Sequence, residues 1–142
     1  MKTTNDADGV RATLAAIAQA ADDGRNDDYV AIFAPDAVWD IPSGRFVGHV
    51  RIRDFLDEIR PTSAQRHVVS NSIIDIDGSE AKVVSDFVFL VHGNTGWSVA
   101  AVGRYHDEFR YGEDRWTLSR REVRDQTPAG FRPASEPVRV RK

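Results

Sequence analysis

One histidine in the sequence stands where proton-transfer chemistry is possible. His67 begins the run QRHVVSNSIIDI, which alternates in the manner of a strand. Imidazole is the side chain that changes charge near neutral pH, and it serves as a general base in many enzymes. Such a base needs a carboxylate to fix its tautomer and to stabilise the imidazolium. The first question is therefore which acidic residue reaches His67.

The candidate carboxylate lies at the end of the first predicted helix, which ends AADDG. On a helical wheel, Asp22 lies at the edge of the apolar stripe that contains Leu14 and Ala18, whereas Asp23 lies about 180° from Leu14, on the solvent side. We therefore predict that Asp22 pairs with His67. A purely structural hydrogen bond is the alternative role for this pair.

The direction in which His67 points depends on the parity of its strand. If Val69 and Ile73 face inward, His67 and Asn71 do so too, because alternate residues share one face. The opposite parity, which begins at Val68, stays open.

The other three histidines show no such context. His49 precedes a predicted helix, His92 ends a strand, and His106 lies among charged residues in RYHDEF. Their spacing is not that of metal ligands, and the chain has no cysteine to supply a thiolate or a disulfide. We expect neither a metal nor a cofactor.

Composition predicts one cytoplasmic domain. The 142 residues are 41% hydrophobic and 29% charged, which is typical of globular proteins. A net charge of -3 gives no reason to expect nucleic acid or an anionic membrane as partner. The apolar runs are too short to cross a bilayer, and the N-terminus lacks an apolar signal-peptide core.

Three helices are predicted in the N-terminal half of the chain. Apolar residues recur at helical spacing over 6–23. A second, short helix begins at Asn26 and is expected to stop at Pro35. A third has apolar residues at helical spacing and ends before Pro61; these residues are Ile52, Phe55, Leu56 and Ile59.

Strands dominate the remainder. After DAVWDI and RFVG come four candidates, namely RHVVSNSIIDI, AKVVSDFVFLVH, WSVAAVGRYHDEF and RWTLSRREV. The short turns between these four imply sequential antiparallel pairing. The expected fold is α+β, with three N-terminal helices packed in the concave face of a curled, mainly antiparallel sheet that encloses a cavity. Strands apolar on both faces predict a homodimer or higher homo-oligomer. We assign residues 1–126 to this domain and 127–142 to a basic C-terminal extension.

A long pattern extends through most of the chain: DDGRNDDYVAIFAPDAVWDI…GRFVGHVRIRDFL…RHVVSNSIIDIDGSEAKVVSDFVF…AAVGRYHDEF…RWTLSRREV. Over about residues 8–124 it resembles the SnoaL-like branch of the nuclear-transport-factor-2-like (cystatin-like) superfamily. That branch includes scytalone dehydratase and hexachlorocyclohexane dehydrochlorinase. The resemblance implies a cone-shaped α+β domain, often dimeric, with a pocket between the helices and the concave face of the sheet.

The resemblance also implies a site. In these relatives an aspartate from the end of the first helix pairs with a histidine that opens a long strand, and the matching positions are Asp22 and His67. The same comparison places six residues on the pocket wall: Trp39, Asn71, Phe87, Phe89, Tyr105 and Arg121. Arg121 is matched to a buried cation that would hold an anionic or leaving group. Trp39, Phe87 and Phe89 have plain core packing as their alternative role.

Two departures narrow the chemistry. The dehydrochlorinase has a lysine where this chain has Ile17, so the resemblance does not extend to dehalogenation. The carboxylate base and tyrosine–acid pair of ketosteroid isomerase have no counterparts that we can place.

The expected function is that of a cofactor-independent lyase or isomerase, similar to a dehydratase. His67 would abstract a proton from a small, mostly apolar cyclic substrate, with Asp22 orienting it. Tyr105, Asn71 or Arg121 would polarise a carbonyl or hydroxyl group. The expected ligand is apolar, aromatic or polycyclic. The alternative is a non-catalytic ligand-binding or assembly domain with the same pocket.

Overall fold

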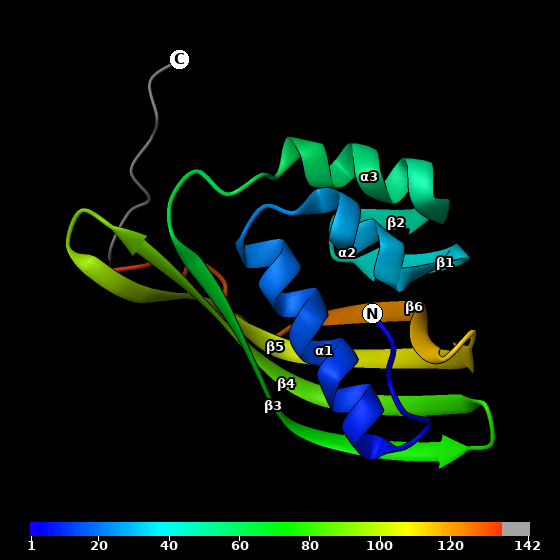
Figure 1. The fold of residues 1–142 in the computed structure, drawn as a ribbon. Coiled ribbons are helices and arrows are strands. Elements are labelled where there is room, and N and C mark those ends of the chain that lie inside the picture. Colours follow the sequence, from blue (N-terminus) through cyan, green and yellow to red (C-terminus); the bar gives the residue numbers. More distant parts are fainter. Residues whose placement is uncertain (135–142) are drawn as a thin grey trace.

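A computed structural model describes residues 1–134, which form three helices and a six-stranded sheet (Figure 1). None of the helices among these residues is long and apolar enough to span a membrane. The elements in chain order are α1 (Ala7–Asp22), α2 (Asn26–Ile32), β1 (Phe33–Ile41), β2 (Gly44–Val47), α3 (Gly48–Glu58), β3 (Gln65–Asp77), β4 (Glu80–Gly93), β5 (Gly96–Gly112) and β6 (Arg115–Asp125).

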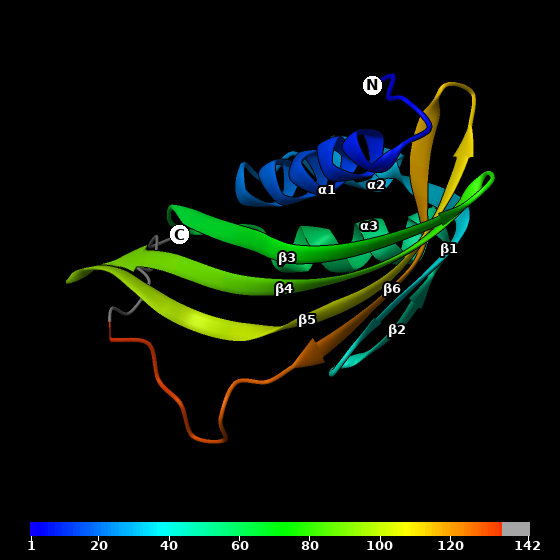
Figure 2. The same cartoon turned by 90° about the horizontal axis from the view of Figure 1, so that it is seen from below.

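The sheet has the strand order β2-β1-β6-β5-β4-β3. Strands β3 to β6 form an antiparallel meander, and β1 pairs with β2 antiparallel and with β6 parallel. The sheet curves around the helices, which all lie on its concave side (Figure 2). These observations confirm the predicted α+β class and the mainly antiparallel sheet.

Helix α1 carries Asp22 to the start of β3. The side chain of Asp6 caps the helix by accepting a hydrogen bond from the Gly9 N–H at 2.8 Å, a contact that satisfies one of the free amides of the first turn. Val10 and Ile17 are buried on the face toward the sheet. Because α1 packs along β3, its last residue meets the beginning of that strand.

Helices α2 and α3 pack against β1 and β2 through aromatic rings. Trp39 of β1 lies 5.9 Å from Tyr29 of α2 and 5.5 Å from Phe55 of α3, measured between ring centroids. Phe46 of β2 stacks on Phe55 at 4.4 Å. Aromatic pairs at such distances contribute beyond their area burial, so this cluster holds Trp39 in one orientation.

The end of the second helix differs from its prediction. The helix was expected to continue to Pro35, but α2 ends at Ile32 and β1 already begins at Phe33. Phe33 is 1% exposed and has extended backbone dihedrals. Burial of this ring in the core outweighs local helix propensity, which is a weak preference in comparison.

The chain beyond β6 continues along β5. The Gln126 N–H donates to the Val102 carbonyl at 2.9 Å, and the Val102 N–H donates to Thr127 Oγ1 at 3.1 Å. Much of the predicted extension, residues 135–142, lies outside the described residues. The division at residue 126 and the homo-oligomer therefore stay predictions.

We expect Gly103→Ala to destabilise the fold and to displace a ring of the cavity. A Cβ at Gly103 of β5 would lie 2.6 Å from the Phe87 ring and would also collide with the Arg124 backbone carbonyl. Overpacking of this kind costs about 1–3 kcal/mol. The free energy of unfolding, measured by urea denaturation, should fall by that amount. Gly112→Ala is the matched control in the same strand, because nothing lies within 4 Å of its Cβ position. Equal stability of the two variants would contradict this packing.

Candidate functional site

The structure brings His67 and Asp22 into direct contact. Nδ1 of His67 lies 2.6 Å from Asp22 Oδ1, and the backbone N–H of His67 donates to Asp22 Oδ2 at 2.8 Å. The Asp22 side chain is 4% exposed and that of His67 is 22% exposed. An ionised carboxylate only accepts hydrogen bonds, so Nδ1 carries the proton. In the neutral imidazole, Nε2 is then left with a free lone pair.

A third residue supports the carboxylate. The side-chain amide of Gln65 donates to Asp22 Oδ1 at 3.3 Å. Burial raises the pKa of Asp22, but the hydrogen bonds from His67 and Gln65 lower it by more, so the pKa lies below its ordinary value. Asp22 is therefore ionised at neutral pH and can stabilise a positive charge on His67.

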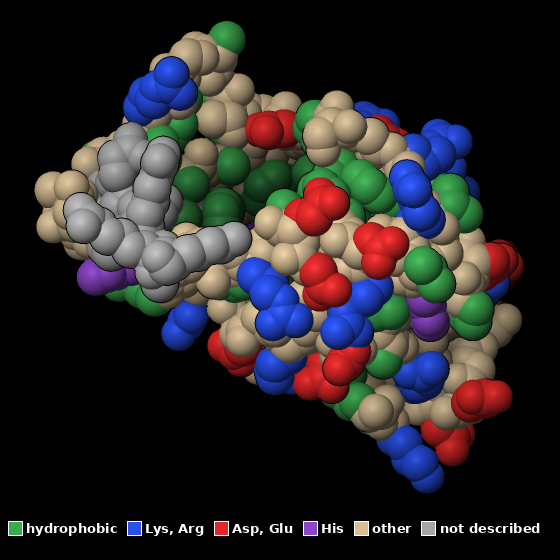
Figure 3. Space-filling model, turned by 90° about the horizontal axis from the view of Figure 1, so that it is seen from above, with side chains coloured by type: hydrophobic (Ala, Val, Ile, Leu, Met, Phe, Trp, Pro, Cys, Tyr) green, Lys and Arg blue, Asp and Glu red, His purple; other side chains and the backbone are tan. Residues whose placement is uncertain are grey.

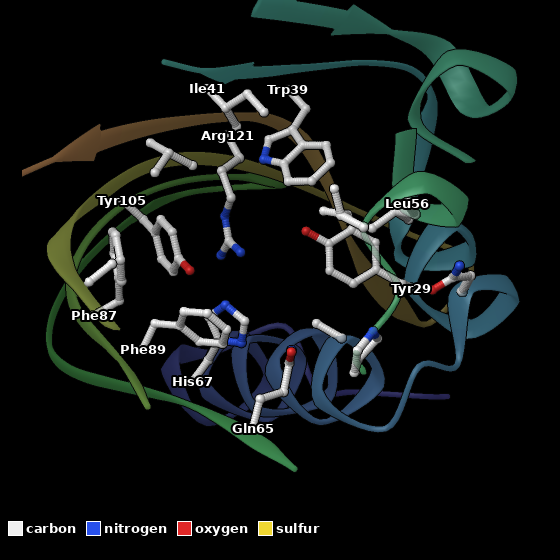
Figure 4. A pocket seen from close by; sticks show the side chains of 16 residues that line it. Tyr29, Trp39, Ile41, Leu56, Gln65, His67, Phe87, Phe89, Tyr105 and Arg121 are labelled. Atoms are coloured by element: carbon white, nitrogen blue, oxygen red, sulfur yellow. The ribbon is translucent and has the colours of Figure 1, made fainter. Parts of the chain in front are cut away.

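His67 lies in the wall of a cavity of about 200 Å³ between the helices and the concave face of the sheet (Figure 4). The face seen from above is hollowed, and hydrophobic side chains form the floor of the depression (Figure 3). Most of the wall is apolar or aromatic. The lining residues are Ala21, Asn26, Tyr29, Trp39, Ile41, Leu56, Ile59, Pro61, Gln65, His67, Phe87, Phe89, Ala101, Tyr105, Arg121 and Val123.

Stacked rings form the sheet side of the cavity. His67 stacks on Phe89 with ring centroids 4.5 Å apart, and these residues are directly paired between β3 and β4. Phe87 stacks on Tyr105 at 4.5 Å, and the guanidinium of Arg121 lies 3.9 Å from the Tyr105 ring centroid. The strand pairing thus fixes the imidazole plane and the position of the cation.

Arg121 and Asp107 form a buried ion pair next to the cavity. Nε and Nη2 of Arg121 donate to the two carboxylate oxygens of Asp107 at 2.8 and 2.9 Å, and both side chains are almost fully buried. Burial lowers the pKa of Arg121, but the attraction of Asp107 outweighs it and raises the pKa overall. The guanidinium is therefore charged, while the pair as a whole carries no net charge.

Two tyrosine hydroxyls complete the polar part of the wall. In Figure 4 the hydroxyls of Tyr29 and Tyr105 and the guanidinium of Arg121 point into the same space, opposite His67. Burial raises the pKa of Tyr29 and of Tyr105. Both hydroxyls therefore remain protonated at neutral pH and can donate hydrogen bonds.

Residues 2–122 match the family model of the SnoaL-like domain. The chain belongs to this family. The match confirms the resemblance seen in the sequence. No curated protein matches the chain.

Solved structures support the same fold for this SnoaL-like domain. A protein of unknown function with a cystatin-like fold from Nostoc punctiforme has a TM-score of 0.79 at 23% identity, covering 91% of this chain and 97% of that chain. A proposed scytalone dehydratase from Novosphingobium aromaticivorans has a TM-score of 0.75 at 20% identity, covering 94% and 93%. A protein from Catenulispora acidiphila, solved in complex with S-DNPA, has a TM-score of 0.75 at 23% identity, covering 82% and 90%. At these identities the likeness shows the fold alone.

Most of the predicted site residues meet at one place in this SnoaL-like domain. His67 and five of the residues predicted for the pocket line the cavity, and Asp22 contacts His67 from behind. The five are Trp39, Phe87, Phe89, Tyr105 and Arg121. Arg121 differs from its expected role, because Asp107 already neutralises the charge that was expected to hold an anion.

Asn71 is the predicted residue that the structure does not bring to this cavity. It has a φ of 53° at an irregularity where the β3–β4 register shifts between Ser70 and Ile73. Its side chain donates to Asp86 at 2.9 Å, in an exposed position. The extra residue reverses the strand parity, so Ile73 is exposed although Val69 faces inward with His67.

Four polar residues of the site were missed, namely Asn26, Gln65, Tyr29 and Asp107. Asn26 was assigned only to the start of its helix. Gln65 and Asp107 carried a signal, because each shares strand parity with a residue already chosen: Gln65 with His67, and Asp107 with Tyr105. Tyr29 was assigned only to the apolar stripe of its helix. Within residues 1–134, no three His, Cys, Asp or Glu side chains group in a way that could hold a metal ion.

We expect Asp107→Asn to destabilise this domain strongly. The substitution leaves the buried guanidinium of Arg121 without its counter-charge, and losing one partner of a buried ion pair costs about 3–5 kcal/mol. Asp36→Asn is the control, because Asp36 pairs with Arg110 at 3.2 Å where the side chains are 70% and 51% exposed. Exposed pairs contribute about 0–1 kcal/mol. Urea denaturation should separate the two variants, and similar losses would contradict the assigned role.

We expect the stabilising effect of Asp22 to depend on acidity. Its pKa is lower in the folded chain than its ordinary value of 3.8, so folding favours the ionised form. The contribution is therefore complete above the unfolded pKa and is lost as the pH falls through the folded pKa. Asp22→Asn should cost about 1.5–3 kcal/mol at neutral pH and clearly less near pH 3.

The matched control is Asp23→Asn, the neighbouring carboxylate, which is 53% exposed. Its free energy of unfolding should stay close to that of the unmodified chain at both pH values. If the difference in the free energy of unfolding between Asp22→Asn and the unmodified chain were as large near pH 3 as at neutral pH, the assignment would be contradicted.

Proposed function

We propose that this chain is a cofactor-independent lyase or isomerase of the dehydratase type. The observation that carries the proposal is the 2.6 Å contact between His67 Nδ1 and Asp22 Oδ1, with the same imidazole in the wall of a mostly apolar cavity. This arrangement leaves Nε2 as a base in a place where a small molecule can reach it. General-base catalysis by such a group contributes about 10²–10⁴-fold.

The reaction begins with the removal of a proton from a carbon next to a carbonyl group. Nε2 of His67 takes the proton, and the C–H electron pair forms a carbon–carbon double bond as negative charge moves to the carbonyl oxygen. Asp22 stabilises the imidazolium that results. In an elimination, the enolate oxygen then re-forms the carbonyl, and the electron pair of the enolate double bond shifts to form a double bond to the next carbon. The C–O bond at that carbon breaks with its electrons on oxygen, and the departing hydroxyl group takes the proton from Nε2 and leaves as water. In an isomerisation, the proton returns to another carbon.

The developing negative charge faces hydrogen-bond donors. The hydroxyls of Tyr29 and Tyr105 and the guanidinium of Arg121 lie across the cavity from His67. Donors held in place before the reaction lower the barrier because they need no reorganisation as charge develops. The Arg121–Asp107 pair keeps this end of the cavity polar but neutral overall.

The cavity favours a small substrate. Its volume of about 200 Å³ is below the range of roughly 300–1,000 Å³ usual for drug-sized ligands. One ring, or two fused rings, therefore suit it better than a larger polycyclic compound. The apolar wall and the stacked aromatic rings select for a cyclic, mostly hydrocarbon skeleton.

The alternative is a pocket that binds a small molecule without chemistry. The structure of the Catenulispora acidiphila protein with S-DNPA is the observation that favours it. In that case the Asp22–His67 contact joins α1 to β3 and has no further role, and replacing His67 by alanine leaves ligand affinity nearly unchanged.

Proton abstraction can be tested without knowing the natural substrate. The protein is incubated in D₂O with α-tetralone or cyclohexanone, and NMR follows the loss of the protons next to the carbonyl. We expect the protein to exceed the rate of buffer alone. His67→Ala should lower the catalysed rate by about 10²–10⁴-fold. Asp22→Asn should lower it as well, since a carboxamide does not stabilise the imidazolium.

The control is His106→Ala, which removes an imidazole that belongs to β5 but is absent from the cavity wall. It should exchange at the unmodified rate. All variants are compared at equal folded fraction by thermal denaturation. If His67→Ala exchanges as fast as the unmodified chain, His67 is not the base.

A further inference from the structure

A residue of the cavity wall carries a hydrogen-bond donor that has no partner among residues 1–134. Nε1 of Trp39 is buried without an acceptor, and Trp39 as a whole is 7% exposed. Among residues 1–134, no other buried side-chain nitrogen or oxygen lacks a hydrogen-bond partner. A buried donor without an acceptor destabilises the fold, and such groups in native proteins call for a specific explanation.

Elsewhere in the core, a buried indole N–H has a hydrogen-bond acceptor. Trp116 is also buried, at 2% exposed, and its Nε1–H donates to the Thr4 carbonyl at 3.0 Å. Trp97 is 50% exposed, so water can reach it. Trp39 differs from both, because it is enclosed and yet unpaired.

The orientation of Trp39 is fixed by its neighbours. Tyr29, Phe33, Phe46 and Phe55 all lie within 6.2 Å of it, measured between ring centroids. In Figure 4 its ring nitrogen is on the edge of the indole that is turned toward Arg121. Trp39 and Arg121 are directly paired between the parallel strands β1 and β6, and both line the cavity.

The charge at this end of the cavity restricts the acceptor. Asp107 binds Nε and Nη2 of Arg121 and cancels its charge, so a carboxylate or phosphate would meet no excess positive charge. The Tyr29 hydroxyl also forms a hydrogen bond with the guanidinium. Further N–H groups remain as donors, since arginine has five in all. A neutral carbonyl oxygen can accept from Trp39 and Arg121 together without introducing an unpaired buried charge.

We propose that Trp39 is a specificity-determining residue whose indole N–H donates to a carbonyl oxygen of the ligand. The pocket then selects neutral cyclic ketones over the corresponding hydrocarbons. This inference rests on the proposed function for its place in a reaction, since that carbonyl is the group that would activate the proton taken by His67. The binding preference itself does not depend on turnover.

The experiment replaces one atom of Trp39. Trp39→benzothienylalanine exchanges the N–H of the indole for sulfur and keeps the shape of the ring system. The probes are α-tetralone and tetralin, which share a bicyclic skeleton and differ in the carbonyl oxygen. Ligand-observed NMR gives the dissociation constant of each probe, and the dissociation constant of tetralin is divided by that of α-tetralone for each protein. Comparing ratios between proteins cancels the intrinsic hydrophobicity of the probes.

We expect the substitution to lower this ratio by about tenfold, because a buried donor no longer discriminates between the two probes. The same replacement at Trp97, which is outside the cavity wall, should leave the ratio unchanged. Trp39→Phe is a second variant that also lacks the donor, and it should shift the ratio in the same direction although it enlarges the cavity.

An unchanged ratio in Trp39→benzothienylalanine overturns the inference, as does failure of both probes to bind the unmodified chain. His67→Ala separates this inference from the proposed function, because it should abolish proton exchange and preserve the ratio. A shifted ratio in a protein that catalyses no exchange supports the role of Trp39 and rejects the lyase. If proton exchange depends on His67 but the ratio does not change on substitution of Trp39, the lyase is supported and the role of Trp39 is rejected.

Discussion

Two hydrogen bonds to a single carboxylate join the end of α1 to the beginning of β3, and the rest of the site depends on them. Asp22 accepts from the His67 backbone N–H at 2.8 Å and contacts its Nδ1 at 2.6 Å. β3 is an edge strand, so this amide has no strand beyond it to pair with. The contact that satisfies the sheet edge therefore also sets the tautomer and the orientation of the imidazole. Under the proposed function, the base is positioned before any ligand arrives.

On the opposite wall, charge and aromatic stacking support one another. Phe87, Tyr105 and Arg121 are layered across β4, β5 and β6, and Asp107 neutralises the guanidinium from its buried side. The lack of a Cβ at Gly103 leaves the space that the Phe87 ring occupies. A cation placed over an aromatic face and paired with a carboxylate gains from both contacts, which offsets the cost of its removal from water.

The fold class and the inward position of Asp22 could be predicted from the sequence because both depend on regular periodicity. The cavity residues Phe87 and Phe89 were instead assigned through the resemblance to the SnoaL-like branch, since periodicity does not separate a cavity wall from plain core packing. The structure does not place Asn71 on the cavity wall, because one extra residue in β3 reverses the alternation of side chains along the strand. The local sequence VSNS contains no glycine that would mark this bulge. The pairing of Asp107 with Arg121 depends on the register between two strands, which the sequence of either strand alone does not determine.

The parallel pairing of β1 with β6 has a consequence for how the cavity is assembled. Trp39 is among the early residues of the chain, whereas its neighbour Arg121 belongs to the last strand, which inserts between β1 and β5. During synthesis the N-terminal helices and β1 leave the ribosome first, and they must wait for nearly the whole domain before this neighbour exists. Contacts between such distant segments close large loops and form slowly. The pocket is therefore complete only when β6 has paired with β1, and a chain that stops before β6 lacks the cation and with it that end of the cavity.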